Sequence, residues 1–204
     1  MSYGGIFYSK GKVISRITPI FHTLEFAFEK SLEINWPKLH LLGFQKVWDW
    51  YFRFEADVLE LTSSSTGRAL NALSHVFHDV LGKDSYADIL WIMIGLEALY
   101  CQGNSNVLGQ LNVKSALLLG KRVSFKKEFN KMYDYRSRFV HGDLNFQNQY
   151  TYVDSSEKVD LHLDDFWSVR ALALATFIAT LQRLVMENWS SISFEYILKG
   201  EPHP

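Results

Sequence analysis

The sequence has a single cysteine, Cys101, among its 204 residues, and this cysteine lies in an apolar run. A disulfide framework needs pairs of cysteines and a cysteine metal site needs several, so neither is available within one chain. We therefore expect a protein that is held together by packing rather than by cross-links, as suits the reducing cytoplasm.

An excess of charge and a long hydrophobic run are also missing. The 21 Lys and Arg residues and 22 Asp and Glu residues leave a formal net charge of -1, so no global basic field attracts nucleic acid and any polyanion site must be local. The longest apolar run, Ile89 to Leu96, is far shorter than the roughly 20 residues that cross a bilayer. The opening residues, MSYGGIFYSKGK, lack the apolar core of a signal peptide. We expect no membrane segment and a cytoplasmic location.

Apolar and aromatic residues, by contrast, are abundant. They make up 48% and 15% of the chain, respectively, which excludes a disordered tail or linker and indicates a large packed interior or interface. The length suits one domain, or one domain with an N-terminal elaboration.

The pattern of turn residues predicts an all-α protein with a less regular start. Residues 1–16 favour a short hairpin or an irregular arm. The polar cluster at 62–67 reads as a loop and predicts a division into an N-terminal extension, 1–66, and a helical domain, 67–204. Glycines 82, 120 and 142 are expected to end helices, and Asp164 to cap the last one. The connection at 143–163 has no clear periodicity, and loops of this length are usually functional or mobile. The helices are expected at 17–34, 43–61, 68–81, 84–101, 105–119, 124–141 and 164–189.

The helix expected at 43–61 carries an aromatic stripe at steps of three and four residues. Its members include Phe44, Val47, Trp48, Tyr51 and Phe54. Such rings can stack nucleic-acid bases. A stripe at helical spacing is more often core or interface, which is the interpretation favoured here.

The stretch YRSRFVHGD, residues 135–143, combines groups suited to phosphate chemistry. His141 falls in the last helical turn, where the helix dipole favours imidazolium, and can hold or donate a proton near neutral pH. Arg136 is about 140° around the helix from His141, yet its long side chain can reach the same point. Arg138 lies nearly on the face of His141, and Ser137 adds a hydroxyl group.

An arginine and a histidine that converge on one point suffice for RNA cleavage without a metal or a cofactor. The 2′-hydroxyl of the RNA is the nucleophile, so the protein supplies a general acid or base, His141, and positive charge for the phosphorane, Arg136 or Arg138. The plainer interpretation is that His141 only complements the helix dipole and that the arginines are solvated.

Three segments in order resemble one family. ILWIMIGLEALYC, QLNVKSALLLG and KMYDYRSRFVHGD are similar to the HEPN superfamily, in its Apea-like or abortive-infection C-terminal branch, whose helices read approximately ALEALY, LLG and LYDxRSxxVHG. The resemblance covers roughly Asp84 to Asp143 and does not cover residues 1–66. The R-x4-6-H motif of the family falls on Arg136 and His141, with Ser137 at the polar position after the arginine and Tyr133 at the tyrosine of the motif.

The resemblance implies a HEPN-type antiparallel helical bundle that forms a homodimer, with the two R-x4-6-H helices facing each other across a composite cleft. Active members are metal-independent endoribonucleases of toxin–antitoxin and abortive-infection systems, so RNA and an antitoxin or another defence protein are the expected partners. Other members are inactive modules that bind RNA or a nucleotide, or only dimerise and recruit partners. Fold alone does not choose between these classes.

Glu97 is a further candidate, since it occupies the LE position of the family pattern. One interpretation is a carboxylate that pairs with Arg136 and orients its planar fork. The other is a helix residue that points to solvent or pairs with a lysine.

The remaining polar residues are weaker candidates. His75 and His78, with Asp79, could begin a metal site, but no third ligand has suitable spacing and an ordinary helix is favoured. The serines do not indicate a hydrolase, because no strand-turn-helix serine elbow is present.

Overall fold

The structure is a computed structural model of the chain that describes residues 5–9, 12–17, 21–54, 61–77, 86–103, 105–122, 126–146 and 157–195. The described part is mainly helical, as the sequence predicts. A short antiparallel hairpin, β1 (Gly5–Ser9) paired with β2 (Lys12–Ile17), matches the hairpin expected near the start. The helices are α1 (Phe21–Glu33), α2 (Phe44–Tyr51), α4 (Ser65–Val76), α5 (Ala87–Tyr100), α6 (Val107–Leu119), α7 (Lys126–His141) and α8 (Glu157–Glu187), with a 3-10 turn, η1 (Phe52–Phe54), after α2.

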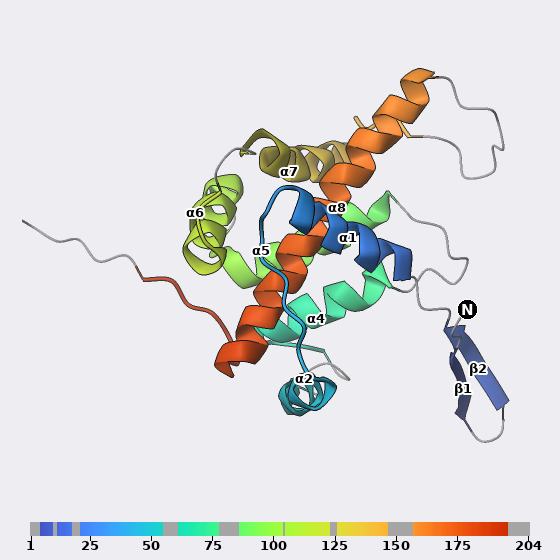
Figure 1. Ribbon diagram of the computed structural model, residues 1–204, viewed down its shortest axis with the longest axis vertical. Helices are drawn as coiled ribbons and strands as arrows, with labels where there is room; N and C mark the ends of the chain where they lie inside the picture. Colours follow the sequence, from blue (N-terminus) through green and yellow to red (C-terminus); the bar gives the residue numbers. More distant parts are fainter. Residues whose placement is uncertain are drawn as a thin grey trace, which may run out of the picture.

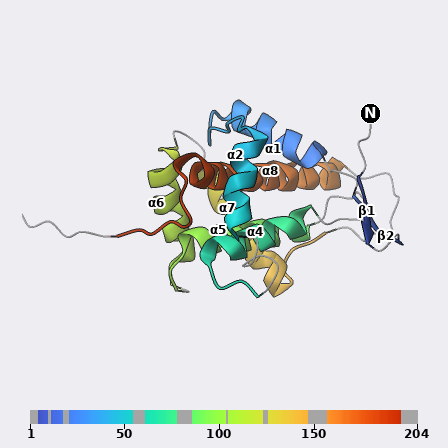
Figure 2. The same ribbon diagram turned by 90° about the horizontal axis from the view of Figure 1, so that it is seen from below.

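Helix α8 is the centre of the bundle. In Figure 1 it runs obliquely through the middle of the molecule, and in Figure 2 α1 lies on one side of it while α4 and α5 lie on the other. It packs against α1, α2, α5, α6 and α7. Its apolar residues are therefore surrounded, and the run from Val169 to Phe177 is buried.

The burial of α8 bears on whether its apolar residues belong to a protein core or to a membrane-spanning segment. The part from Leu161 to Glu187 is long and apolar enough to cross a membrane, but 78% of its most apolar window is buried inside the protein. The apolar surface of this helix is already covered by other helices, as expected of the central helix of a bundle.

A buried ion pair ties three helices together. Arg170 of α8 donates to Oδ2 of Asp88 in α5 at 2.5 Å and to the hydroxyl of Thr23 in α1 at 3.1 Å. All three side chains are almost fully buried. Because an unpaired buried charge is costly, this cluster holds α1 and α5 at fixed positions on α8.

The described part of the N-terminal extension packs into the same core. Ala27, Trp36, Trp50 and Phe54 belong to one apolar cluster with residues of α5, α7 and α8. The indole of Trp36 also donates to the carbonyl of Gly120 at 3.0 Å. The division into 1–66 and 67–204 stays a prediction, while the packing makes residues 21–54 an extension of the bundle.

Several helix ends follow the predicted signals. Gly120 and Gly142 have φ of +92° and +76°, a backbone conformation that glycine adopts without strain. The loop predicted at 62–67 is shorter than expected, because the side chain of Ser64 accepts from Gly67 N and α4 begins at Ser65. Gly82 lies outside the described residues.

The expected cap at Asp164 is wrong. Helix α8 begins at Glu157, so Asp164 lies inside it. The neighbouring Asp165 accepts hydrogen bonds from Lys131 and Tyr135 of α7. Asp164 was predicted as the cap because it precedes the apolar run, but the helix begins seven residues before it.

The helix expected at 43–61 is also shorter than predicted. Helix α2 ends at Tyr51 and continues as the 3-10 turn η1, and residues 55–60 lie outside the described part. Only part of the stripe forms core: Phe54 is buried and Tyr51 packs against the core, whereas Phe44, Val47 and Trp48 are exposed. Trp50, which does not belong to the stripe, is buried. The indole of Trp50 donates to the carbonyl of Trp189 at 2.8 Å, and this bond turns the opposite face of α2 outward.

Candidate functional site

Helix α7 presents the candidate residues from a fixed position. Phe129, Met132 and Tyr135, at three-residue steps, are buried against the rest of the bundle. The helix ends at His141, where the amides of Asp143 and Leu144 donate to the carbonyl of Arg138 at 2.8 and 3.2 Å. The positive φ of Gly142 makes this reversal possible.

Arg136 lies beside Glu97, as one of the two interpretations of Glu97 expected. Nε of Arg136 is 3.4 Å from Oε1 of Glu97, and Nη2 donates to Oε2 at the same distance. The two side chains are 27% and 21% exposed. The Nε contact is an ion pair by distance but lacks hydrogen-bond geometry. The carboxylate of Glu97 therefore attracts the Nε–Nη2 edge of the guanidinium but does not form a close bidentate pair with it. The remaining N–H groups of Arg136 are available to a ligand.

This pair opens into a pocket of about 410 Å³. Three of the candidates, Glu97, Tyr133 and Arg136, line it, together with Cys101, Gly103 and Val107. The ring of Tyr133 lies 5.9 Å from the guanidinium carbon of Arg136. A solvent-accessible cation between an aromatic ring and a carboxylate is a local site for an anion, of the kind that a chain with balanced charge requires.

The burial of Glu97 affects its protonation. Desolvation raises its pKa and the positive charge of Arg136 opposes the increase, with desolvation the larger effect. Cys101 responds in the same direction: desolvation, followed by the charge of Glu97, raises its pKa to about 11, against the opposing charge of Lys114. Cys101 is therefore a neutral thiol at physiological pH and is unsuited to act as a nucleophile.

A network from α6 holds the loop that forms one wall of the pocket. The Gln110 side chain accepts from Gln102 N and donates to the carbonyls of Gln102 and Ser105. The buried ammonium of Lys114 donates to the carbonyl of Tyr100 at 2.7 Å and to Oε1 of Gln110 at 2.8 Å. These bonds hold the backbone of Tyr100, Gln102 and Ser105 to α6. Neither Gln110 nor Lys114 is among the candidates that the sequence suggests.

The remaining candidates are not brought to this pocket. His141 is exposed, and its side chain has no hydrogen bond or ion pair to another described residue. Arg138 lies 3.8 Å from Asp134 and donates to the carbonyl of Asp143 at 3.2 Å, so it supports the end of its own helix. Ser137 is half-buried and does not line the pocket.

A second polar cluster beside Arg136 was missed. Tyr135 donates to Oδ2 of Asp165 at 2.8 Å, and Lys131 lies 2.5 Å from Oδ1. Desolvation raises the pKa of Asp165. The hydrogen bonds from Lys131 and Tyr135, together with the positive charge of Lys131, outweigh this effect, so the pKa of Asp165 is lowered. The i,i+4 spacing of Lys131 and Tyr135 places both on one face of α7 and was the available signal.

His75 of α4, the described member of the histidine pair, packs against an aromatic ring. The imidazole of His75 stacks on the indole of Trp91, with 4.0 Å between ring centroids. His78 and Asp79 lie outside the described residues. Within the described ranges, no group of three or more His, Cys, Asp or Glu residues could hold a metal ion.

Comparison with known proteins yields no relative: no family model, curated protein or solved structure matches the chain. The HEPN resemblance therefore depends on the quoted motifs alone.

Proposed function

We propose that the protein is a metal-independent endoribonuclease of the HEPN type that acts as a homodimer, in toxin–antitoxin or abortive-infection biology. The observation that carries this proposal is the position of Arg136. Its guanidinium is half-buried in an open pocket and lies against a carboxylate on one edge, whereas a solvated arginine would favour a purely structural role.

The chemistry requires few groups. The 2′-hydroxyl of the RNA attacks the adjacent phosphorus, the bond to the 5′-oxygen breaks, and the products are a 2′,3′-cyclic phosphate and a 5′-hydroxyl. Arg136 stabilises the charge on the phosphorane oxygens, and His141 transfers a proton to or from one of the two reacting oxygens. Glu97 orients the guanidinium, while Tyr133, Ser137 and Arg138 contribute contacts around the RNA.

The separation of Arg136 and His141 in one chain supports a dimeric site. The two residues are about 7.5 Å apart along the axis of α7 and about 140° around it, and His141 is exposed outside the Arg136 pocket. A second chain that packs α7 against α7 would supply its histidine to the first pocket. The exposed side chains of Val140 and Phe146 give this end of α7 apolar surface for such a contact.

The second candidate is a non-catalytic module that binds RNA or a nucleotide at Arg136, or that dimerises and recruits an antitoxin or another defence protein. The exposure of His141 also fits this alternative, because binding an anion needs Arg136 and does not need a proton donor.

Cleavage of total RNA in EDTA distinguishes the two. We expect the wild type to leave 2′,3′-cyclic phosphate ends, and Arg136→Ala and His141→Ala each to lower the rate by roughly 10²-fold or more. Arg183→Ala and His40→Ala are matched controls, because Arg183 pairs with Glu187 and the His40 side chain is exposed, both outside this pocket. A folded wild type that binds RNA through Arg136 but cuts none would favour the binding module.

A further inference from the structure

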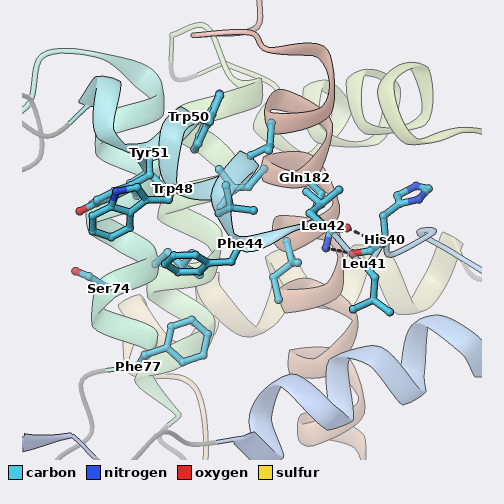
Figure 3. A pocket seen from close by; sticks show the side chains of 16 residues that line it. His40, Leu41, Leu42, Phe44, Trp48, Trp50, Tyr51, Ser74, Phe77 and Gln182 are labelled. Carbon is cyan, nitrogen blue, oxygen red and sulfur yellow. Dashed lines mark hydrogen bonds between the residues drawn. The ribbon is translucent and has the colours of Figure 1, made fainter. Parts of the chain in front are cut away.

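A second and larger pocket lies between α2, α4 and α8, and it shares no lining residue with the Arg136 pocket. Its volume is about 710 Å³, within the range of roughly 300–1,000 Å³ typical of small-molecule sites. Figure 3 shows Phe44, Trp48 and Tyr51 of α2 along one wall, with Ser74 and Phe77 of α4 beside them. The opposite wall comes from α8 and the segment 40–42.

The wall from α4 is a regular helical stripe. Leu70, Leu73, Ser74 and Phe77 follow one another at three- and four-residue steps and all face the pocket. Leu70, Leu73 and Phe77 are only half-buried. The apolar face of α4 therefore packs against α5 on one side and leaves this part directed at an open space.

Polar bonds hold the space open. The side chain of Gln182 accepts from His40 N at 2.9 Å and donates to His40 O at 2.8 Å, so the segment 40–42 is attached to α8. At the other end, Lys46 donates to the carbonyl of Met186 and Arg53 to Oδ1 of Asn188. Helix α2 and the turn η1 are thus anchored to the end of α8 by hydrogen bonds.

The position of α2 leaves aromatic surface exposed to solvent. Phe44 is 76% and Trp48 47% exposed, and their rings stack on each other with 5.9 Å between centroids. Exposed apolar surface that is gathered around a concavity marks a binding site more often than a single exposed ring does. A ligand in the pocket would cover these rings.

The residues that line the pocket favour an uncharged ligand. None of its sixteen residues is Asp, Glu, Lys or Arg, and the polar members are His40, Ser74, Gln182 and the polar ends of the Trp48 and Tyr51 rings. Among the described residues of this lining, a phosphate or carboxylate would find no lysine or arginine, and desolvating its charge would oppose binding. The indole N–H of Trp48 and the hydroxyl of Tyr51 have no hydrogen-bond partner among the described residues, so each can meet a single uncharged acceptor.

The surroundings favour a small molecule over a protein. A stable protein interface buries about 800 Å² on each partner. Next to the pocket, however, α2 turns the polar side chains of Gln45, Lys46 and Asp49 to solvent. On α2, the apolar side chains of Phe44, Val47, Trp48 and Tyr51 thus line the pocket, while these polar ones face away from it.

We propose that this pocket binds a small, uncharged, mainly apolar molecule, which inserts between the aromatic wall of α2 and the aliphatic wall of α4 and α8. This binding is independent of the ribonuclease proposal, because no residue is shared. The occupant is recognised by its shape and by the absence of charge, with at most one acceptor group directed to Trp48 or Tyr51.

The test is a fluorescence titration of the full chain with the uncharged probe N-phenyl-1-naphthylamine. We expect saturable binding of one probe per chain, and binding at least fivefold weaker for its charged relative 8-anilino-1-naphthalenesulfonate. Ser74→Trp fills the pocket from an exposed position whose hydroxyl bonds only to its own helix at Asn71. It should lower the affinity for the uncharged probe at least tenfold, as should Leu73→Trp. Leu117→Trp, at an exposed position on α6 outside the pocket, is the matched control and should leave the affinity unchanged.

Circular dichroism and the urea midpoint establish that each variant is folded. If Leu73→Trp unfolds, Ser74→Trp alone tests the proposal, because Ser74 is exposed. The proposal is overturned if the wild type shows no saturable binding, if Ser74→Trp binds the probe as well as the control does, or if the sulfonate binds more tightly. Sedimentation of the wild type gives the competing outcome: a dimer that dissociates in Ser74→Trp would mean that a second copy of the chain occupies the pocket.

Discussion

At the scale of single residues, Glu97 combines a cost to the fold with a role in the site. Because desolvation raises its pKa, the folded state retains a proton on Glu97 at a pH where the unfolded chain has lost it. Protonated Glu97 therefore favours the folded state relative to ionised Glu97. This contribution to the free energy of unfolding is complete below about pH 4.5, the ordinary pKa of glutamate, and is lost as the pH rises through the raised pKa of the folded state.

Replacing Glu97 by Gln tests this role. We expect Glu97→Gln to lower RNA cleavage by about tenfold, since a neutral amide orients the Arg136 guanidinium less strongly. Its stability relative to the wild type should rise between pH 4.5 and 7, because the desolvated charge is absent. Urea midpoints across this range and initial cleavage rates give the two readouts. An unchanged rate would remove Glu97 from the site.

Cys101 reports on the same pocket. With a pKa of about 11, its thiol should react with iodoacetamide at pH 7.5 more than tenfold more slowly than an ordinary cysteine of pKa about 8.5, since the thiolate is the nucleophile. In Glu97→Gln the reaction should accelerate, because one cause of the raised pKa is gone. Mass spectrometry of the alkylated chain follows the rate. Equal rates in the wild type and the variant would mean that Glu97 does not act on Cys101.

At the scale of elements, the helix ends at Gly120 and Gly142 could be predicted because glycine supplies a local signal. The start of α8 ahead of Asp164, and the division of the α2 stripe into buried and exposed members, have a different cause. Both depend on neighbours far away in the sequence: α7 bonds to Asp165, and the carbonyl of Trp189 accepts from Trp50. Periodicity locates an apolar face but does not tell which neighbour covers it.

The candidate site was predictable to a similar extent. The contact of Arg136 with Glu97 was anticipated only through a resemblance in motif, because the two residues are 39 positions apart. Gln110 and Lys114 were missed, since a single glutamine and lysine on a helix usually indicate a solvated face. Their role follows from the end of α5 and the segment after it: Lys114 bonds to the carbonyl of Tyr100, and Gln110 to backbone groups of Gln102 and Ser105.

Lys114→Met tests the support that α6 gives to this loop. The change removes two charged hydrogen bonds from a buried position, so we expect it to lower the free energy of unfolding by about 2 kcal/mol. RNA cleavage should fall and Cys101 should be alkylated faster, because the loop around the pocket loosens. Lys127→Met, at an exposed position on α7, is the control for urea unfolding. A stable variant with normal cleavage would show that the loop holds without Lys114.

At the scale of the whole molecule, the ion pair of Arg170 with Asp88 joins three helices. Asp88→Ala removes the carboxylate that accepts from the buried guanidinium of Arg170, so we expect a loss of about 3–5 kcal/mol in stability. The double variant Asp88→Leu, Arg170→Leu should lose less, since it removes the buried guanidinium as well. Thermal and urea unfolding measure both. A double variant less stable than Asp88→Ala would contradict the expected coupling.

The proposed dimer can be tested by combining two inactive variants in one heterodimer. If each site takes Arg136 from one chain and His141 from the other, a heterodimer of Arg136→Ala and His141→Ala chains has one intact site and one site without either residue. Co-expression with two different affinity tags isolates this heterodimer. We expect about half the wild-type cleavage rate, with both variant homodimers inactive. An inactive heterodimer would place Arg136 and His141 of each site in the same chain.

The central position of α8 also has a consequence for synthesis. The ribosome completes α1, α4, α5 and α7 before it makes α8, so their inner faces have no α8 to pack against while the chain grows. Contacts between α1 and α8 span more than a hundred residues, and such distant contacts form slowly. The nascent chain therefore exposes apolar surface until translation has passed residue 187, and exposed apolar surface of this kind promotes aggregation.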